Sequence, residues 1–405
     1  MAVVDVVLVI VLLAALLSGL RAGFFSGLGW LIGLVAAGAL LPFVLPEVSG
    51  YLTGSPVRGV AVVATGVVLL GVGAAIGAAI GSNLRRGVED SPLGVVERLL
   101  GGVLGLAVGV AVISLLGSGV KSAGIPGISA AAASSTVLRA IEENTPEPVA
   151  RALARIEAGV RDDTLPVLGD ALAGGVLGPG AAPAPEELDI ADPDLARAAA
   201  SVARITGTAW TCSTASNGSG FVVAQDRVVT NAHVVAGVEE TVVELPGQVA
   251  RSGQVVWFDP AADLAVIAVV VDAPPLPVVD PLPVGASAAV QGYPYGGPFT
   301  TVPAGVVGLG EVALPGLGGG AVSVGGAGET REIYRLSTTV VPGNSGGPLL
   351  TEAGEVAGVV FARDEERADI AYALSSTELR AALEALDARG PSPAAVDTGA
   401  CARTP

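Results

Sequence analysis

The sequence is poor in several residue types on which many protein functions depend. Its 405 residues include one histidine and two cysteines, and only 4% are aromatic. Two cysteines are too few for a disulfide-rich scaffold, although they suffice for one bridge. Basic residues are scarce as well, since 21 Lys and Arg stand against 38 Asp and Glu for a net charge of −17. Nucleic-acid phosphates need basic partners, so this balance argues against a nucleic-acid partner.

Charged residues of both signs make up only 15% of the chain, whereas 51% is hydrophobic and the mean hydropathy is +0.67. A soluble protein of this size rarely has such a composition, which predicts that part of the chain lies in lipid. The apolar residues concentrate before residue 120, and the remainder is an ordinary mixture of polar and apolar residues. We therefore expect a membrane domain over residues 1–120.

Four apolar segments lie in this region: Val3–Leu20, Gly23–Leu45, Gly59–Ile80 and Leu99–Val120. Each has about 18–23 residues, enough for a helix to cross a hydrocarbon core of about 30 Å. The first segment could instead be a cleaved signal peptide. It carries Asp5 rather than a basic start, and a second segment follows almost at once. These features favour four spanning helices.

Glycines recur at four-residue intervals in these segments: Gly19/Gly23/Gly27, Gly73/Gly77/Gly81 and Gly101/Gly105/Gly109. On a helix this spacing places small residues along one face, where two backbones can approach closely. The alternative is that glycine is simply abundant, with 57 in the chain. We interpret the repeats as the contact faces of a packed helical bundle.

The short connections between the apolar segments differ in charge. Arg21 lies in the first connection, and Arg85, Arg86 and Arg98 lie in the third. The positive-inside rule places these two connections in the cytoplasm, so the chain after residue 120 should be extracytoplasmic. The four segments and the early acidic residue resemble the colicin V production protein family. That resemblance implies residence in the lipid bilayer and no particular chemistry.

Residues 121–198 read as a connector between two domains. Apolar residues at helical spacing run from Val137 to Val160, and Pro146 and Pro148 must interrupt them, so two short helices are expected. The stretch 174–185 is rich in Gly, Pro and Ala and predicts a flexible linker, where self-cleavage is conceivable. The third domain is then residues 199–405.

Residues 199–405 contain many short runs of Val, Ile, Thr and aromatic residues, separated by Gly, Pro and Asp. Such spacing is typical of an all-β sandwich or a pair of barrels. The predicted strands are Ser219–Val223, Arg227–Thr230, Glu239–Leu245, Gly253–Phe258, Leu264–Val270, Ala288–Gly292, Thr300–Leu309, Glu332–Leu336, Glu355–Phe361 and Ile370–Leu374. A helix over Ser376–Ala388 is expected to close the domain.

Two motifs on this scaffold carry nucleophile chemistry. His233, the single histidine, lies in the string T-N-A-H-V-V, and Ser345 lies in G-N-S-G-G-P. The amides of Gly343 and Ser345, with Asn344 shaping the loop, could form an oxyanion hole. The second string also fits the G-x-S-x-G nucleophile elbow of α/β-hydrolases. That fold needs a histidine after the serine, and none follows Ser345, so the order is that of a chymotrypsin-like triad.

The third member of a triad would be a buried carboxylate that orients the histidine. Asp263 is the preferred candidate because an apolar run follows it at once, which predicts burial. Asp259 and Asp272 are the alternatives. The expected catalytic residues are therefore His233, Asp263 and Ser345, and their chemistry calls for no cofactor and no metal.

These strings resemble the bacterial trypsin-like proteases of the high-temperature-requirement type. The resemblance covers residues 200–385 and implies a chymotrypsin-like double β-barrel. By the family pattern Thr339 lies at the base of the S1 pocket, with Phe361 and Ala373 on its walls, which implies an uncharged P1 residue. The chain departs from the family by leaving no room for a PDZ domain after the protease.

The combination of a four-span anchor with such a protease looks like the actinobacterial membrane-anchored, periplasmic acid-resistance serine proteases. This resemblance spans the whole chain. It implies an envelope stress enzyme that cleaves extracytoplasmic proteins, with cell-wall hydrolases among the candidate substrates. The oligomeric state stays open.

Cys212 and Cys401 flank the protease domain, and we expect them to form a disulfide, since an extracytoplasmic compartment is oxidising. Three rival functions are a non-catalytic sensor on a protease fold, a transport-associated membrane protein, and an esterase. The intact triad argues against the first, the scarcity of charge in the spans against the second, and the β-rich pattern against the third.

Overall fold

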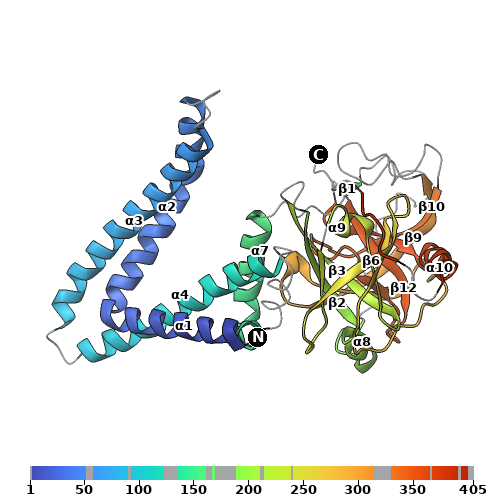
Figure 1. Cartoon of the computed structure of the whole chain (residues 1–405), viewed down its shortest axis with the longest axis horizontal. Helices are drawn as coiled ribbons and strands as arrows, with labels where there is room; N and C mark the ends of the chain where they lie inside the picture. The colour runs from blue at the N-terminus through green and yellow to red at the C-terminus, as the bar shows by residue number, and fades with distance from the viewer. Residues whose placement is uncertain are drawn as a thin grey trace. The chain divides into compact units, whose positions relative to one another are not determined.

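The computed structural model describes residues 2–51, 58–89, 93–122, 135–160, 167–168, 188–209, 214–238, 240–313, 330–364, 367–390 and 394–399. The chain divides into two compact units, Ala2–Ser114 and Leu115–Pro405. Figure 1 shows the helices and strands of each unit.

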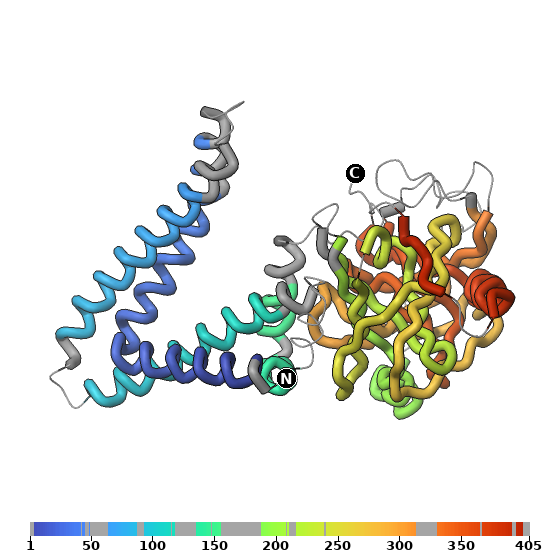
Figure 2. The backbone as a smooth tube through the Cα atoms, viewed as in Figure 1, coloured from blue at the N-terminus to red at the C-terminus, as the bar shows by residue number. Residues whose placement is uncertain are grey.

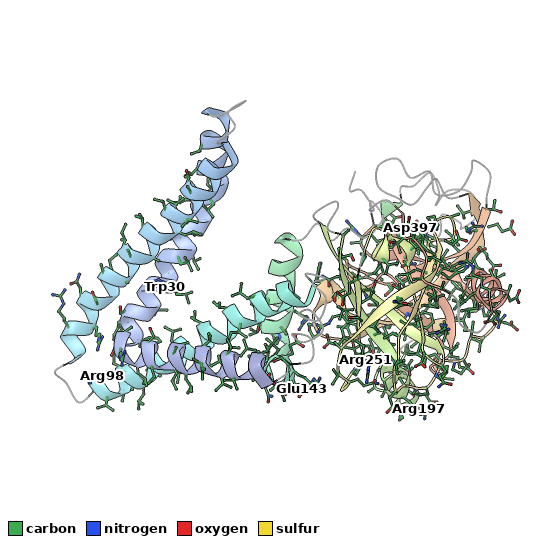
Figure 3. All side chains as sticks on the ribbon, in the orientation of Figure 1. Trp30, Arg98, Glu143, Arg197, Arg251 and Asp397 are labelled. Carbon is green, nitrogen blue, oxygen red and sulfur yellow. The ribbon has the colours of Figure 1, made fainter. Side chains whose placement is uncertain are left out.

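The first unit is helical, as the apolar segments predict. Its helices are α1 (Ala2–Ala22), α2 (Phe24–Tyr51), α3 (Arg58–Glu89) and α4 (Gly94–Ser122). Each contains a stretch long and apolar enough to span a membrane. Apolar side chains cover their outer surfaces, Trp30 of α2 among them, and Arg98 lies near the start of α4 (Figure 3). These four helices make the chain a multi-pass membrane protein.

Glycines form the closest contacts between these helices. A Cβ atom at Gly77 of α3 would overlap the carbonyl oxygen of Gly29 on α2, and one at Gly19 of α1 would overlap that of Gly101 on α4. The tube view shows α2 alongside α3 and α1 alongside α4 (Figure 2). Small residues are therefore needed for the backbones to approach this closely.

A charged pair ties the ends of the four helices together. Glu97 of α4 is 5% exposed, accepts a hydrogen bond from the Phe25 N–H of α2 at 3.3 Å, and lies 3.6 Å from Arg85 Nε of α3. Arg85 Nη1 also donates to the carbonyl oxygen of Arg21 at the end of α1. Gly23 turns the chain between α1 and α2 with φ +77°, and a side chain there would meet the Glu97 carboxylate.

Replacing Gly77 by valine is expected to destabilise the membrane unit. The new Cβ has backbone rather than a flexible side chain in its way, so α2 and α3 must separate, at a cost of roughly 1–3 kcal/mol. Gly71→Val is the matched control, because a Cβ at Gly71 of the same helix meets nothing within 4 Å. The measurement is the thermal unfolding midpoint of both variants in detergent; equal midpoints would contradict glycine-mediated packing.

The second unit begins with two connector helices, α6 (Thr136–Asn144) and α7 (Glu147–Val160). The Ser135 hydroxyl caps α6 by accepting a hydrogen bond from the Leu138 N–H at 3.2 Å. The break between the helices falls at Pro146, as its missing N–H predicts.

Six strands close into the first β-barrel, in the order β2-β3-β4-β7-β6-β5. They are β2 (Val202–Ala209), β3 (Thr214–Ala224), β4 (Arg227–Thr230), β5 (Glu240–Glu244), β6 (Arg251–Asp259) and β7 (Leu264–Ala268). Every pairing in the barrel is antiparallel, for example Val228 with Ile267. The short helices α8 (Pro193–Ala199) and α9 (Ala232–Val235) precede β2 and follow β4.

The second sheet has the order β1-β12-β11-β8-β9-β10-β13, and pairing of β12 with β13 closes six of its strands into a barrel. The strands are β8 (Ser287–Gly292), β9 (Thr300–Ala313), β10 (Thr330–Ser337), β11 (Pro348–Leu350), β12 (Val356–Asp364) and β13 (Ile370–Ser375). The two-residue strand β1 (Val167–Leu168) adds to β12 in parallel. Helix α10 (Ser376–Asp387) ends the domain where the sequence predicts a helix.

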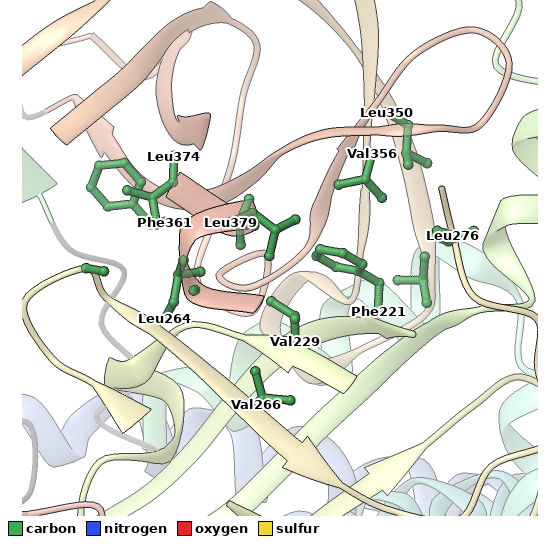
Figure 4. Packing of buried hydrophobic residues seen from close by; sticks show 14 of the residues in the cluster. Phe221, Val229, Leu264, Val266, Leu276, Leu350, Val356, Phe361, Leu374 and Leu379 are labelled. Atoms are coloured by element: carbon green, nitrogen blue, oxygen red, sulfur yellow. The ribbon is translucent and has the colours of Figure 1, made fainter. Parts of the chain in front are cut away.

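The prediction of a chymotrypsin-like double β-barrel is confirmed. The main apolar core joins the two barrels: Phe221 and Val229 of the first belong to one cluster with Leu350 and Val356 of the second and Leu379 of α10 (Figure 4). His233 lies on α9 and Asp263 precedes β7 in the first barrel, whereas Ser345 lies on a loop of the second, so packing of the two barrels on this core sets their relative position.

Candidate active site

His233 and Asp263 lie together on the first barrel. His233 belongs to α9, directly after β4, and Asp263 lies between β6 and β7 and is 1% exposed. The His233 Nδ1 atom is 2.9 Å from Asp263 Oδ2 and 3.0 Å from Oδ1. The backbone N–H of His233 also donates to Oδ1, at 3.0 Å. This double contact fixes both the direction of the carboxylate and the plane of the imidazole.

The backbone around Asp263 is held in an unusual conformation. Asp263 has φ +50°, a left-handed value that non-glycine residues seldom adopt. The side chain of Asn231 donates to the Asp263 carbonyl oxygen at 2.8 Å and supports this turn. The alternative acids lie in other surroundings: the Asp259 carboxylate accepts from the N–H groups after it, and the backbone of Asp272 pairs with the side chain of Gln248.

Ser345 lies on the loop between β10 and β11 of the second barrel and is 2% exposed. Its carbonyl oxygen accepts a hydrogen bond from the Ser219 N–H of β3 at 2.7 Å, which docks the loop on the first barrel. The next residue, Gly346, has φ +81° and lies so close to the carbonyl oxygen of Ser219 that a side chain would overlap it. Glycine is therefore required at position 346 both by its left-handed backbone and by the lack of room for a side chain.

The loop leaves two backbone donors free. Among the described residues, neither the Gly343 N–H nor the Ser345 N–H donates a hydrogen bond. The preceding carbonyl, that of Pro342, instead accepts from the Tyr295 N–H at 2.6 Å. A trans peptide points its C=O and N–H in opposite directions, so the Gly343 N–H is directed away from Tyr295.

Two buried side-chain atoms complete the arrangement. His233 Nε2 and Ser345 Oγ are both buried, and neither has a hydrogen-bond partner in the described part of the chain. Buried polar atoms without partners are rare and mark functional positions. An imidazole nitrogen and a hydroxyl in this condition are candidates for a base and a nucleophile.

The structure adds a residue that the sequence did not indicate. The Ser219 hydroxyl donates to the Gly343 carbonyl oxygen at 2.7 Å and accepts from the Tyr293 N–H at 2.9 Å. Ser219 is fully buried, and its backbone N–H holds Ser345 as well. The only signal in the sequence is a serine between two glycines at the start of a predicted strand.

Ser219→Ala is expected to lower kcat about tenfold, which corresponds to about 1.4 kcal/mol in the barrier. The variant removes both hydrogen bonds of the hydroxyl and so releases the carbonyl oxygen of the Gly343–Asn344 peptide. Ser216→Ala is the control, since the Ser216 hydroxyl on the same strand has no hydrogen-bond partner among the residues that the structure describes. Steady-state hydrolysis of a peptide substrate measures both, and identical kcat values for the two variants would refute the role of Ser219.

The predicted S1 residues are spread over three segments. Thr339 is exposed and lies six residues before Ser345 in the loop between β10 and β11, Phe361 is fully buried in β12, and Ala373 is fully buried in β13, paired with Val360. Cys212 and Cys401 lie outside the described residues, as does the stretch 174–185.

A partly buried cation, Arg204, lies beside Tyr293 and Gly296. Arg204 Nη2 of β2 is 2.6 Å from Glu244 and 3.5 Å from Glu142, and Nη1 donates to the Gly296 carbonyl oxygen at 2.9 Å. Burial by itself lowers the pKa of Arg204, but attraction to Glu244 and Glu142 raises it above its usual value. The guanidinium lies over the Tyr293 ring, and burial raises the pKa of that phenol.

Both the N-terminal and the C-terminal half of the chain match known protein families. Residues 218–359 match the trypsin-like peptidase domain, and residues 4–146 match the colicin V production protein. Serine protease Rv3671c of Mycobacterium tuberculosis is 32% identical over 325 residues, which cover 79% of each chain. The chain belongs to the family of this protease. It is accordingly a membrane-associated serine protease of the high-temperature-requirement type.

A solved structure of this protease and one further relative agree with this assignment. The crystal structure of the Rv3671c protease in its active form has 34% sequence identity and a TM-score of 0.50, and covers 56% of this chain and 100% of its own. The mitochondrial serine protease HTRA2 of Bos taurus is 36% identical over 173 residues, which cover 41% of this chain and 35% of the relative.

Proposed function

We propose that the chain hydrolyses peptide bonds of extracytoplasmic proteins with His233, Asp263 and Ser345 as its catalytic triad. One observation carries this proposal. The buried Asp263 carboxylate contacts His233 Nδ1 with both oxygens, while His233 Nε2 has no hydrogen-bond partner within the described ranges of the chain. An imidazole held in this way has one defined tautomer and offers its other nitrogen as a base.

The proposed mechanism has two halves, acylation and deacylation of Ser345, and His233 transfers protons in both. His233 Nε2 takes the proton of Ser345 Oγ as this oxygen attacks the scissile carbonyl carbon. The Gly343 and Ser345 N–H groups stabilise the oxyanion. The histidine then gives its proton to the leaving amine, and an acyl-enzyme remains. Water, deprotonated by the same nitrogen, attacks the ester, and the acid product leaves as Ser345 regains its proton.

Substrate preference at P1 is proposed from Thr339, Phe361 and Ala373. None of these side chains is charged, so nothing in the proposed pocket would pair with a Lys or Arg at P1. The proposed preference is for an uncharged, modest P1 side chain. A peptide library read by mass spectrometry tests it, and cleavage mainly after Lys or Arg would contradict it.

The protease domain is proposed to lie on the extracytoplasmic side of the membrane, and the enzyme to act in an envelope or acid stress response. The basic residues Arg21, Arg85, Arg86 and Arg98 support this orientation by their place in the first and third connections. Proteins of the cell envelope, including cell-wall hydrolases, are the proposed substrates. A disulfide between Cys212 and Cys401 is proposed on the same ground, and two free thiols in a non-reducing mass measurement would exclude it.

The test of the proposed function uses the full-length protein in detergent. Unfolded casein and a simple ester are offered to the enzyme, with fluorophosphonate-treated enzyme as the control. Cleavage of casein that the treatment abolishes is the expected result. Hydrolysis of the ester alone would favour an esterase, and no hydrolysis of either would favour a sensor, so either outcome would contradict the proposal.

A further inference from the structure

The connector helices pack on the protease domain of the second unit. Ala154 of α7 is 5% exposed, and its Cβ would be 2.6 Å from a Cβ placed at Gly297. Glu142 of α6 reaches Arg204, and Arg139 Nη2 donates to the Gln248 carbonyl oxygen at 3.2 Å. Contacts therefore form at three separate places along the two helices.

Two of these three contacts lead to a single short helix, η2 (Pro294–Gly296), one directly from α7 and one through Arg204. Gly297 follows it directly and meets α7, while the carbonyl oxygen of Gly296 is held by Arg204. Tyr295, inside η2, has left-handed dihedrals of φ 57° and ψ 21°. A non-glycine residue persists in this conformation only where its surroundings hold it there.

Helix η2 in turn lies against the loop between β10 and β11, which carries Gly343 and Ser345. The Tyr295 N–H is the donor that holds the Pro342 carbonyl oxygen at 2.6 Å. A Cβ at Gly343 would be 2.6 Å from the same Tyr295 nitrogen, so the two segments are in close backbone contact. If Tyr295 moved away, the Pro342–Gly343 peptide would lose the bond that keeps its carbonyl out of the oxyanion hole.

We propose that docking of α6 and α7 on η2 and Arg204 holds the Pro342–Gly343 peptide in its productive orientation, so that the connector completes the oxyanion hole. In this role Arg204 is a positioning residue that acts through Gly296. The sense of the effect is activation, because in the docked structure the Gly343 N–H donates to no described residue. The inference rests on the proposed function, since it concerns the same oxyanion hole.

The test compares full-length variants in detergent on a peptide substrate. In one, residues 136–160 are replaced by a Gly/Ser segment of equal length; in another, Ala154→Arg forces α7 away from Gly297. Ala152→Arg is the matched control, because Ala152 is exposed on the same helix. The first two should lose about 10- to 100-fold in kcat, below the ~10²–10³-fold loss for an oxyanion donor removed outright. Ala152→Arg should match wild type.

The KM value distinguishes this positioning role from a structural one. We expect KM to change less than about threefold, because the oxyanion donors act mainly in the transition state. Arg204→Lys should keep more kcat than Arg204→Met, since it retains the charge between Glu244 and Glu142. The proposal is wrong if the variant in which a Gly/Ser segment replaces residues 136–160 keeps kcat within about twofold of wild type or gains activity. It is also wrong if only the KM of that variant changes. Wild-type protein without Ser345-dependent activity would instead overturn the proposed function itself.

Discussion

Ser345→Ala is expected to lower kcat by about 10⁶-fold, the loss that follows removal of a triad nucleophile. The substitution deletes the attacking oxygen and leaves the loop intact. The backbone carbonyl of Ser345 still accepts from Ser219, and Gly346 keeps its left-handed turn. Because Ser345 Oγ makes no hydrogen bond in the described part of the chain, its removal should not lower stability.

The comparison should use purified full-length protein in detergent, with the rate of peptide hydrolysis and the thermal unfolding midpoint measured on each variant. Ser287→Ala, at the start of β8 in the same barrel, serves as the control and should behave as wild type. A variant at Ser345 that retains more than about one hundredth of wild-type kcat would show that another group is the nucleophile.

The second large effect is expected for Asp263→Asn, which should lower kcat about 10⁴-fold, as the equivalent change does in the serine protease template. An asparagine at this position fits the space but can present its NH₂ group to His233 Nδ1. The imidazole then carries its proton on Nε2 and cannot act as a base toward Ser345. The His233 N–H contact with Oδ1 would also be weakened.

Asp259→Asn is the matched control for this change. Asp259 caps a turn through Oδ1, which accepts from the Ala261 and Ala262 N–H groups, and an asparagine oxygen can do the same. We expect its kcat to remain close to wild type. If Asp259→Asn lost as much activity as Asp263→Asn, the orienting carboxylate would be misassigned.

The barrels followed from local patterns in the sequence, and the proposed triad rests on such patterns as well. A single histidine, a glycine-flanked serine after it and an acid before an apolar strand left few possible arrangements. The strands β2 and β11 escaped prediction for physical reasons. β2 carries Gly, Arg and Thr residues that weaken the alternation, and β11 has only three residues, too few for a period to show.

The contacts that shape the loop around Gly343 and Ser345 could not be predicted from the sequence, because they join segments that are distant along the chain. Ser219 acts across 124 residues on Gly343. Tyr295 has a left-handed backbone although nothing in its composition requires one. Docking of α7 through Ala154 depends on a small residue meeting Gly297, and neither residue type is distinctive in a chain with 57 glycines.

In the membrane unit, too, local patterns could be predicted from the sequence, whereas a contact between distant residues could not. The four spans and the glycine faces were visible as periodic patterns, and the helices pack through those faces. The joining of the helix ends by Arg85 and Glu97 was not predicted, since the two residues belong to different helices and each alone reads as a solvated charge.

The most direct test of the central claim is to locate the fluorophosphonate adduct on the full-length protein by peptide mass spectrometry. A fluorophosphonate phosphonylates a serine only where a base and an oxyanion hole activate its hydroxyl. We predict a single adduct on Ser345, absent from the His233→Ala variant. An adduct on another residue, or equal labelling of the His233→Ala variant, would contradict the proposed triad.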